Sequence, residues 1–371
     1  MMEAVGATAR PPAVTVIGEA LIDLVQLAAP GDYRARPGGS PFNVAVGLAR
    51  LGHRTALMAR LADNTFGRML RTHAAAEGVD LTYAPAAAEP TTLAVVSMDP
   101  EGRAGYDFYL DATADWQWTE AETALVPRET AVLHFGSVAS WTSPADAHIH
   151  SAVQRLRAEG TALISYDPNV RPTLLGDPER GRRAVERSVG IAHLVKASRE
   201  DVEWLYPDTP IERIAAHWLE LGALLVVITD GPDGAHAFHA SAGSLSRPGR
   251  KVAVVDTVGA GDAFTSGLLG ASARHGLHSP QTLAAADPGV LRTVVDDAIL
   301  VSALTCERLG ADPPTALPRH GQPARAPLEV TELAFTDDNG PTRTVSSTPL
   351  PMPPVLVTAR HTPKTSSHLA R

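Results

Sequence analysis

The sequence predicts an α/β fold with a mostly parallel central sheet, and two observations carry this prediction. From residue 131 onward, short apolar runs typical of strands alternate with longer segments that place apolar residues at helical spacing. Polar residues and glycines cluster after several of these strands, at the end where open parallel sheets bind ligands. At 371 residues the chain can bury one large core or two modest ones.

Composition and charge exclude several classes of protein. The net charge of −9, without a long basic run, argues against a nucleic-acid partner. Cys306 is the single cysteine, so an internal disulfide or a multi-cysteine metal site is excluded, and we expect it to be a small core residue. No apolar run reaches membrane-spanning length, and residues 1–12 lack the apolar segment of a signal peptide. We therefore expect a cytoplasmic protein that has no membrane partner.

The first strand is predicted at residues 14–18, and residues 21–25 are expected to continue it. Asp23 places a carboxylate in this apolar setting. It could serve as a turn or capping residue, or it could accept hydrogen bonds from ligand hydroxyls at the end of a strand. The residues alone leave both interpretations open.

Two glycines, Gly38 and Gly39, precede a helix predicted at residues 44–52. Since they lack a Cβ atom, a ligand can approach the backbone closely there. Asn43, on the first turn of the helix, can face such a ligand. The next predicted elements are a strand at 55–61, a capping loop at 63–67 and a helix at 68–77.

A predicted hairpin interrupts the alternation of strands and helices. A strand at 91–98 is followed by a turn at 99–102 and by a second strand at 103–110, which carries Tyr106, Phe108 and Tyr109. Because such a hairpin does not belong to a βα unit, we expect it to project as a small β lid over a site.

The second half of the chain predicts four strands, each followed by polar residues. They lie at 132–136, 163–166, 194–196 and 224–229, with a helix at 146–159. The last helix is predicted to start at Asp296-Asp297, interpreted as first-turn residues, and to run to about residue 309. Residues 319–371 are rich in Pro, Ser, Thr and Arg and predict a disordered tail, in which residues 328–335 could form one strand.

One motif, at residues 256–264, combines a Gly-Ala-Gly turn with a carboxylate. It lies between a strand-like run at 251–255 and a helix predicted at 264–273. In such a turn successive N–H groups and the positive end of the helix dipole converge, so an anion can bind there. Asp262 places a carboxylate in that cradle, which suits a base that deprotonates a hydroxyl attacking the bound anion. An ordinary turn, with Asp as the N-terminal cap, is the alternative.

These stretches together resemble the PfkB-type carbohydrate kinases, also called the ribokinase family, from about residue 14 to 315. The N-terminal signature is similar to residues 38–45, with Gly52 and Gly67 at suitable spacing, and the C-terminal signature to residues 256–264 with Gly267. The resemblance implies a ribokinase-like αβα sandwich with a mostly parallel central sheet. It places the kinase domain at 13–318, with a small β lid formed from about 22–40 and 91–118.

The family resemblance further implies ATP-dependent phosphorylation of a sugar hydroxyl. Asp262 would be the catalytic base, and the amides around Gly259, Ala260 and Gly261 would form the anion hole for the transferring phosphoryl group. The residues implied for sugar binding are Asp23, Gly38, Gly39, Asn43, Arg103, Tyr106, Phe108 and Arg171. Those implied for ATP binding are Ser198, Thr229, Gly231 and Gly234, together with Gly259 and Gly261.

The resemblance also implies Mg²⁺ as a cofactor, K⁺ as a further candidate, and a homodimer formed through the lid. Residues 198–201 stand where the family usually shows Asn-x-x-Glu, a motif tied to Mg²⁺ and phosphate. Ser198 replaces the Asn and Asp201 replaces the Glu, so a shorter carboxylate would act on Mg²⁺ indirectly.

Within the family the sequence is most similar to fructokinases and 2-keto-3-deoxygluconate kinases. Kinases of the keto-acid sugar often carry Arg after the aromatic pair of the lid, where this chain has Leu110. Since a substrate carboxylate favours a guanidinium partner, its absence favours a neutral ketohexose such as fructose, although Arg103 could substitute. The segments that favour a fructokinase lie at 90–94, 108–109, 114–115 and 310–314.

Other activities stay open on sequence grounds. The same fold could phosphorylate 2-keto-3-deoxygluconate, ribose or a nucleoside, or it could sense a sugar without catalysis. An NAD-binding oxidoreductase is disfavoured, because no Gly-x-Gly-x-x-Gly fingerprint follows the first strand.

Overall fold

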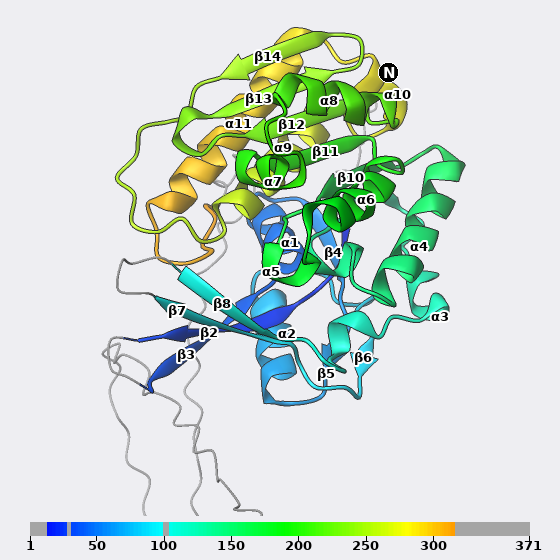
Figure 1. Cartoon of the computed structure of the whole chain (residues 1–371). Helices are drawn as coiled ribbons and strands as arrows, with labels where there is room; N and C mark the ends of the chain where they lie inside the picture. Colours follow the sequence, from blue (N-terminus) through cyan, green and yellow to red (C-terminus); the bar gives the residue numbers. More distant parts are fainter. Residues whose placement is uncertain (1–12, 28–30, 99–103, 316–371) are drawn as a thin grey trace, which may run out of the picture.

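The computed structural model of the chain describes residues 13–27, 31–98 and 104–315 (Figure 1). The predicted tail at 319–371, the turn at 99–102 and Arg103 lie outside these residues. In the part that the structure describes, no helix combines the length and the apolar character needed to cross a membrane.

The main sheet has eight strands in the order β14-β13-β12-β11-β10-β9-β1-β4. Neighbouring strands from β12 to β4 run parallel, whereas β13 and β14 are antiparallel additions at one edge. The predicted mostly parallel sheet is therefore confirmed. In chain order the strands are β1 (Ala13–Ile17), β4 (Arg54–Met58), β9 (Thr130–Gly136), β10 (Leu163–Asp167), β11 (Leu194–Ser198), β12 (Leu225–Thr229), β13 (Ala235–His239) and β14 (Gly243–Arg247).

Helices cover both faces of this sheet, as predicted for an αβα sandwich (Figure 1). One face is covered by α1 (Ser40–Arg50), α2 (Thr65–Ala76), α9 (Ala260–Arg274), α10 (Pro280–Ala284) and α11 (Pro288–Cys306). The other is covered by α4 (Ala145–Glu159), α5 (Pro172–Leu175), α6 (Pro178–Val189), α7 (Arg199–Leu205) and α8 (Ile211–Glu220). Short connecting elements are α3 (Glu120–Thr123) and the 3₁₀ turns η1 (Ala114–Trp116), η2 (Val138–Ser140) and η3 (Gly231–Asp233).

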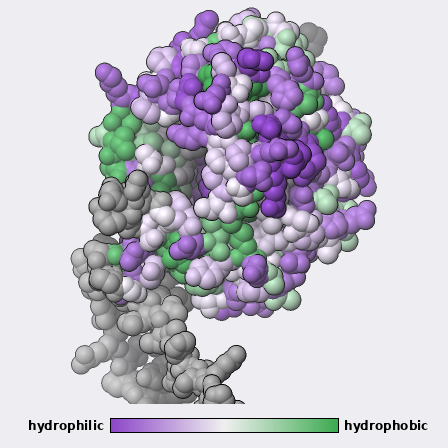
Figure 2. Space-filling view, viewed as in Figure 1, coloured by the Kyte–Doolittle hydropathy of each residue, from purple (hydrophilic) through white to green (hydrophobic). Residues whose placement is uncertain are grey.

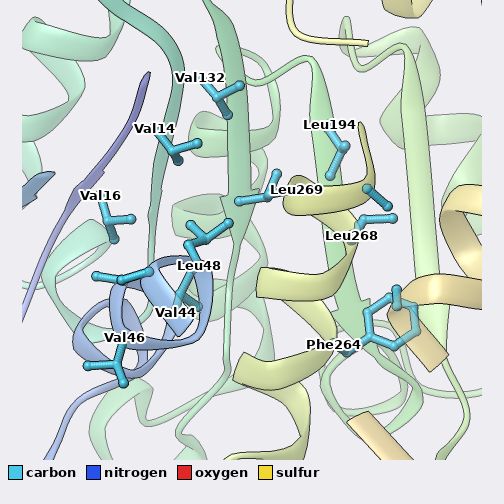
Figure 3. Close-up of a cluster of buried hydrophobic side chains, with 14 of the residues drawn as sticks. Val14, Val16, Val44, Val46, Leu48, Val132, Leu194, Phe264, Leu268 and Leu269 are labelled. Atoms are coloured by element: carbon cyan, nitrogen blue, oxygen red, sulfur yellow. The ribbon is translucent and has the colours of Figure 1, made fainter. Parts of the chain in front are cut away.

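Alternation along the strands divides the core into two layers. Successive side chains of a strand point to opposite faces of a sheet. Leu194 therefore packs with residues of α1 and α9, whereas Val195 packs with residues of α4 and α6. Figure 3 shows the first layer, in which Leu268 and Leu269 of α9 approach the strands. This packing fixes α9, and with it the residues at its N-terminus, against the sheet.

A second sheet of four strands, β3-β2-β7-β8, extends from the body of the molecule (Figure 1). It contains the predicted hairpin, because β7 and β8 pair antiparallel. Residues 21–25 were expected to continue the first strand, and this is wrong: β2 leaves the main sheet and pairs with β3 and β7. The strands are β2 (Leu21–Gln26), β3 (Tyr33–Gly38), β7 (Leu93–Met98) and β8 (Ala104–Tyr109), and a separate pair is formed by β5 (Leu61–Ala62) and β6 (Ala86–Ala87).

The last helix begins eight residues before the predicted start. Asp287 caps α11 by accepting hydrogen bonds from the amides of Gly289 and Val290. The prediction that Asp296 and Asp297 are first-turn residues is thus wrong. Both lie in the middle of the helix, where Asp296 forms an ion pair with Arg247 and Asp297 forms one with Arg274.

The strand predicted at 251–255 is also absent, although four of these five residues are apolar. The amides of Val255 and Asp256 both donate to the carbonyl oxygen of Cys306, at 2.8 and 3.2 Å, so this backbone is held by the end of α11. Val254 and Val255 are 63% and 62% exposed, which a buried strand would not allow. Figure 2 shows apolar residues at the side of the molecule where this loop runs. Cys306 itself is half-buried and does not belong to the core.

The cap of α11 gives a test of this boundary. Asp287→Ala should lower the free energy of unfolding by about 1 kcal/mol, because two amides lose their acceptor. Asp296→Ala, which breaks a partly exposed ion pair, should cost less, between about 0 and 1 kcal/mol. Urea unfolding of both variants measures the difference. A larger loss for Asp296→Ala would contradict the assigned start of the helix.

Candidate active site

The first turns of two helices meet at Asp262. Its Oδ1 accepts a hydrogen bond from Oγ of Ser40 at 2.6 Å, and its Oδ2 accepts one from Nδ2 of Asn43 at 2.8 Å. Ser40 and Asn43 stand at the start of α1, whereas Asp262 stands at the start of α9. Burial raises the pKa of Asp262, and the hydrogen bonds from Ser40 and Asn43 oppose that rise. The site therefore holds a carboxylate that can both ionise and accept a proton.

The Gly-Ala-Gly turn forms the N-terminus of α9. Gly259 is the N-cap residue at φ +74°, and a Cβ atom on it would overlap Ala311, so only glycine fits there. The amide of Ala260 donates to the carbonyl of Thr257 at 3.2 Å. Among the described residues, the amides of Gly261 and Asp262 have no acceptor. Free amides at a helix N-terminus can hold an anion.

A second carboxylate, that of Asp23, comes from the lid strand β2. Burial and then the charge of Asp262 raise the pKa of Asp23 to about 6, while Arg171 opposes this rise. Gly38 leaves room for it, because a Cβ atom on Gly38 would overlap the Asp23 carboxylate. A Cβ atom on Gly39 would lie 2.8 Å from the carbonyl oxygen of Glu19. The two glycines thus allow close packing of the protein's own atoms around the site.

Aromatic residues of β8 lie above these carboxylates. The rings of Tyr106 and Phe108 stack with centroids 6.0 Å apart and planes 13° apart. Burial and the charge of Asp23 raise the pKa of the Tyr106 hydroxyl. Arg171 is held on its own loop by the Oδ1 of Asn169 at 2.8 Å and by the carbonyl of Val170 at 3.0 Å. Tyr106 of the lid and Arg171 of the body therefore both act electrostatically on or with Asp23.

The residues predicted for ATP binding lie at the carboxyl ends of β11 and β12. Ser198 and Thr229 are paired in register across these strands. Gly231 and Gly234 follow with φ of +48° and +105°, conformations that favour glycine. The structure thus brings this group together at the carboxyl ends of two neighbouring strands.

Asp201, the predicted magnesium residue, is fully engaged by backbone amides. Its Oδ1 accepts from Val170 at 2.9 Å, and its Oδ2 accepts from Ser198 at 3.0 Å in a capping box. Within the described ranges, no group of three or more His, Cys, Asp or Glu residues could hold a metal ion. Any role of Asp201 toward a cation would therefore pass through water or through the nucleotide.

Sequence reasoning missed three residues of this site. Ser40 lies within the N-terminal signature, which predicted no role for it, yet its hydroxyl donates a hydrogen bond to Asp262. Lys196 and Asp167 form a buried ion pair of 2.9 Å below α9. A charged residue inside an apolar strand is a signal that could have identified Lys196, since lysine is almost never buried without a partner.

Comparison with known proteins agrees with this geometry. Residues 12–316 match the pfkB family carbohydrate kinase domain. The fructokinase of Rhizobium leguminosarum bv. trifolii is 34% identical over 283 residues, which cover 75% of this chain and 85% of that protein.

Two solved structures are similar to the whole described fold. The fructokinase of Xylella fastidiosa with bound ATP aligns with a TM-score of 0.75 at 26% identity, covering 81% of this chain and 94% of that one. A double mutant of the Vibrio cholerae O395 fructokinase, with fructose, ADP and a potassium ion bound, aligns with a TM-score of 0.72 at 28% identity, covering 82% and 95%. The family match spans nearly all of the described residues, and the chain belongs to the pfkB family of carbohydrate kinases.

Proposed function

We propose that the protein transfers the γ-phosphoryl group of ATP to a hydroxyl of a neutral ketohexose, with fructose as the substrate best supported. The observation that carries this proposal is the carboxylate of Asp262, set among free amides where the first turns of α1 and α9 meet. A base beside an anion cradle is the pair of groups that phosphoryl transfer to an alcohol requires.

In the proposed reaction Asp262 accepts the proton of the sugar hydroxyl. That oxygen forms a bond to the γ-phosphorus, the bond between the γ-phosphorus and the bridging β-phosphate oxygen breaks, and ADP leaves with the bond's electron pair. The free amides of Gly261 and Asp262 would stabilise charge on the transferring group. The hydrogen bonds from Ser40 and Asn43 hold the carboxylate in one orientation before the sugar arrives.

We assign sugar binding to groups of the lid and of the body that lie around Asp23. Asp23 offers acceptors for hydroxyls, and Arg171 has further donors besides the NH1 group that its own loop engages. Tyr106 and Phe108 supply an apolar surface from the lid. Leu110, which follows the aromatic pair, offers no cation to a substrate carboxylate. The similarity to fructokinases also supports a neutral sugar as the substrate.

For the nucleotide we assign Ser198, Thr229, Gly231 and Gly234, and the ATP-bound relative supports this use of the fold. When bound, Mg²⁺ would neutralise charge on the nucleotide phosphates. Asp201 fits only an indirect role, through water or through the nucleotide, because backbone amides engage both of its oxygens. The potassium ion of the Vibrio cholerae structure supports K⁺ as a second cation.

We also propose that the protein forms a homodimer through the lid, where Tyr33 and Tyr109 are exposed. We propose that it acts in the cytoplasm.

A coupled assay of ADP release tests the substrate. With fructose, 2-keto-3-deoxygluconate, ribose and adenosine as acceptors, we expect the highest kcat/KM for fructose. A higher value for 2-keto-3-deoxygluconate would replace fructose by the keto-acid sugar. Sugar binding measured by calorimetry without ADP release from any acceptor would instead indicate a non-catalytic sensor.

Asp262→Asn tests the base. It should lower kcat by about 10²- to 10⁴-fold, because the amide cannot accept the proton, while fructose and ATP still bind. Steady-state kinetics and calorimetry measure the two effects. A variant that keeps near-normal kcat would remove Asp262 from the role of base.

The hydrogen bond from Ser40 gives a pH test. Activity requires the Asp262 carboxylate, so it falls as the pH drops through the pKa of Asp262. Ser40→Ala removes a donor that stabilises the carboxylate, and the acid limb of the kcat/KM profile should move upward by about one pH unit. Ser266→Ala, whose buried hydroxyl donates to the carbonyl of Ala263, is the control and should leave the limb in place. An unmoved limb in Ser40→Ala would contradict the assignment.

A further inference from the structure

Lys196 lies directly beneath the first turn of α9. It is the third residue of β11 and is 4% exposed. A Cβ atom on Gly261 would lie 3.3 Å from its Nζ, so the ammonium lies close to the backbone of the cradle at Gly261. Its hydrogen-bond partner is Asp167, at 2.9 Å, which is 1% exposed.

Stability alone does not favour a lysine at this place. The N-terminus of a helix carries partial positive charge, so a cation next to it is disfavoured. A buried ion pair often contributes no more stability than apolar residues of the same size. An ammonium has three donors, and in the part of the chain that the structure describes Nζ of Lys196 donates to Asp167 alone. The remaining donors are thus available at the base of an anion-binding turn.

The surroundings keep this side chain charged and fixed. Burial by itself would lower the pKa of Lys196, but the carboxylates of Asp167, Asp201 and Asp262 outweigh burial and raise it. The hydroxyl of Thr265 lies 3.1 Å from Oδ2 of Asp167 and 3.1 Å from the carbonyl oxygen of Gly261. The ion pair is thereby tied to the same turn of α9 that presents the free amides.

We propose that Lys196 is a positioning residue for phosphoryl transfer: its ammonium, held by Asp167, places a positive charge beneath the anion cradle at Gly261. This inference rests on the proposed function. Negative charge on the equatorial oxygens of the transferring group would meet the amides first and the ammonium behind them. A charge that is already in place in a site of low dielectric acts more strongly than one exposed to water.

The same charge acts on Asp262. Groups that face this carboxylate are Ser40 and Asn43 from α1, Asp23 from β2, Asp167 from β10 and Lys196 from β11, and Asp201 of α7 faces Lys196. Among these groups Lys196 is a cation. Its charge lowers the pKa of Asp262 and so favours the ionised carboxylate. Removing it should therefore weaken the cradle and also make the base harder to ionise.

Lys196→Met is the first test. We expect kcat to fall by about 10- to 100-fold, less than or equal to the loss of one direct oxyanion donor. The KM for fructose should stay within about twofold, because the sugar groups are untouched, and the acid limb of the pH profile should move to higher pH. An unchanged kcat together with an unmoved limb would overturn the proposal.

The double variant Lys196→Met/Asp167→Asn separates a functional charge from a structural ion pair. Lys196→Met alone leaves Asp167 buried without its cation, so its Tm should drop, and the double variant should recover much of that drop. The proposal requires that kcat stays low in the double variant. Recovery of kcat together with Tm would show that the pair only holds the fold, and would overturn the proposal.

Arg60→Met is the matched control for loss of a buried cation. Arg60 is 7% exposed and pairs with Glu89 and Glu122. We expect a lower Tm with kcat and the acid limb unchanged. If Arg60→Met lowered kcat as much as Lys196→Met does, the effect would be a general consequence of buried charge loss, and the proposal would fail.

Binding of ADP with aluminium fluoride and fructose gives a readout without turnover. Lys196→Met should weaken this complex by about the same factor as kcat, and should weaken ATP binding less, if the ammonium favours the transferring group. Equal weakening of both would overturn the proposal. Failure of the wild-type protein to release ADP with any sugar would instead reject the proposed function, so the two failures can be told apart.

Discussion

The site depends on hydrogen bonds from a distant helix that offset the effect of burial on one carboxylate. Burial raises the pKa of Asp262, and the hydrogen bonds of Ser40 and Asn43 lower it. Those donors come from a helix more than two hundred residues earlier in the chain, so α1 and α9 must stay in register. The apolar layer that packs both helices on the sheet is thus a condition for the chemistry of the site as well as for stability (Figure 3).

The glycines around the site serve close packing at least as much as ligand access. Gly38 yields its space to the carboxylate of Asp23, and Gly39 approaches the carbonyl of Glu19. These contacts bring the junction of β3 and α1 close to Asp23 and to the backbone of Glu19. A side chain at either position would push the lid away from the body and would move Asp23 from the neighbourhood of Asp262.

The sequence predicted the fold and the central motif because both depend on local patterns. Each strand, each helix and the Gly-Ala-Gly-Asp turn can be identified from a short continuous stretch of sequence. The start of α11 was misplaced because the acidic pair Asp296-Asp297 looked like a first turn, while the Asp287-Pro288 cap was overlooked. The strand at 251–255 failed because pairing needs a partner strand, and the end of α11 takes up that backbone instead. Ser40 and Lys196 gain their partners through contacts across the fold, which no pattern along the chain reveals.

The close approach of Gly259 and Ala311 places the segment after α11 against the turn that carries the free amides. Ala311 follows the last helix, and it fills the space beside the turn that carries the free amides. A fusion or domain swap that replaces the residues directly after α11 would remove Ala311, and the turn at Gly259 would lose this packing contact. The residues just beyond α11 therefore support the conformation of this turn, and an engineered variant of the chain should keep them.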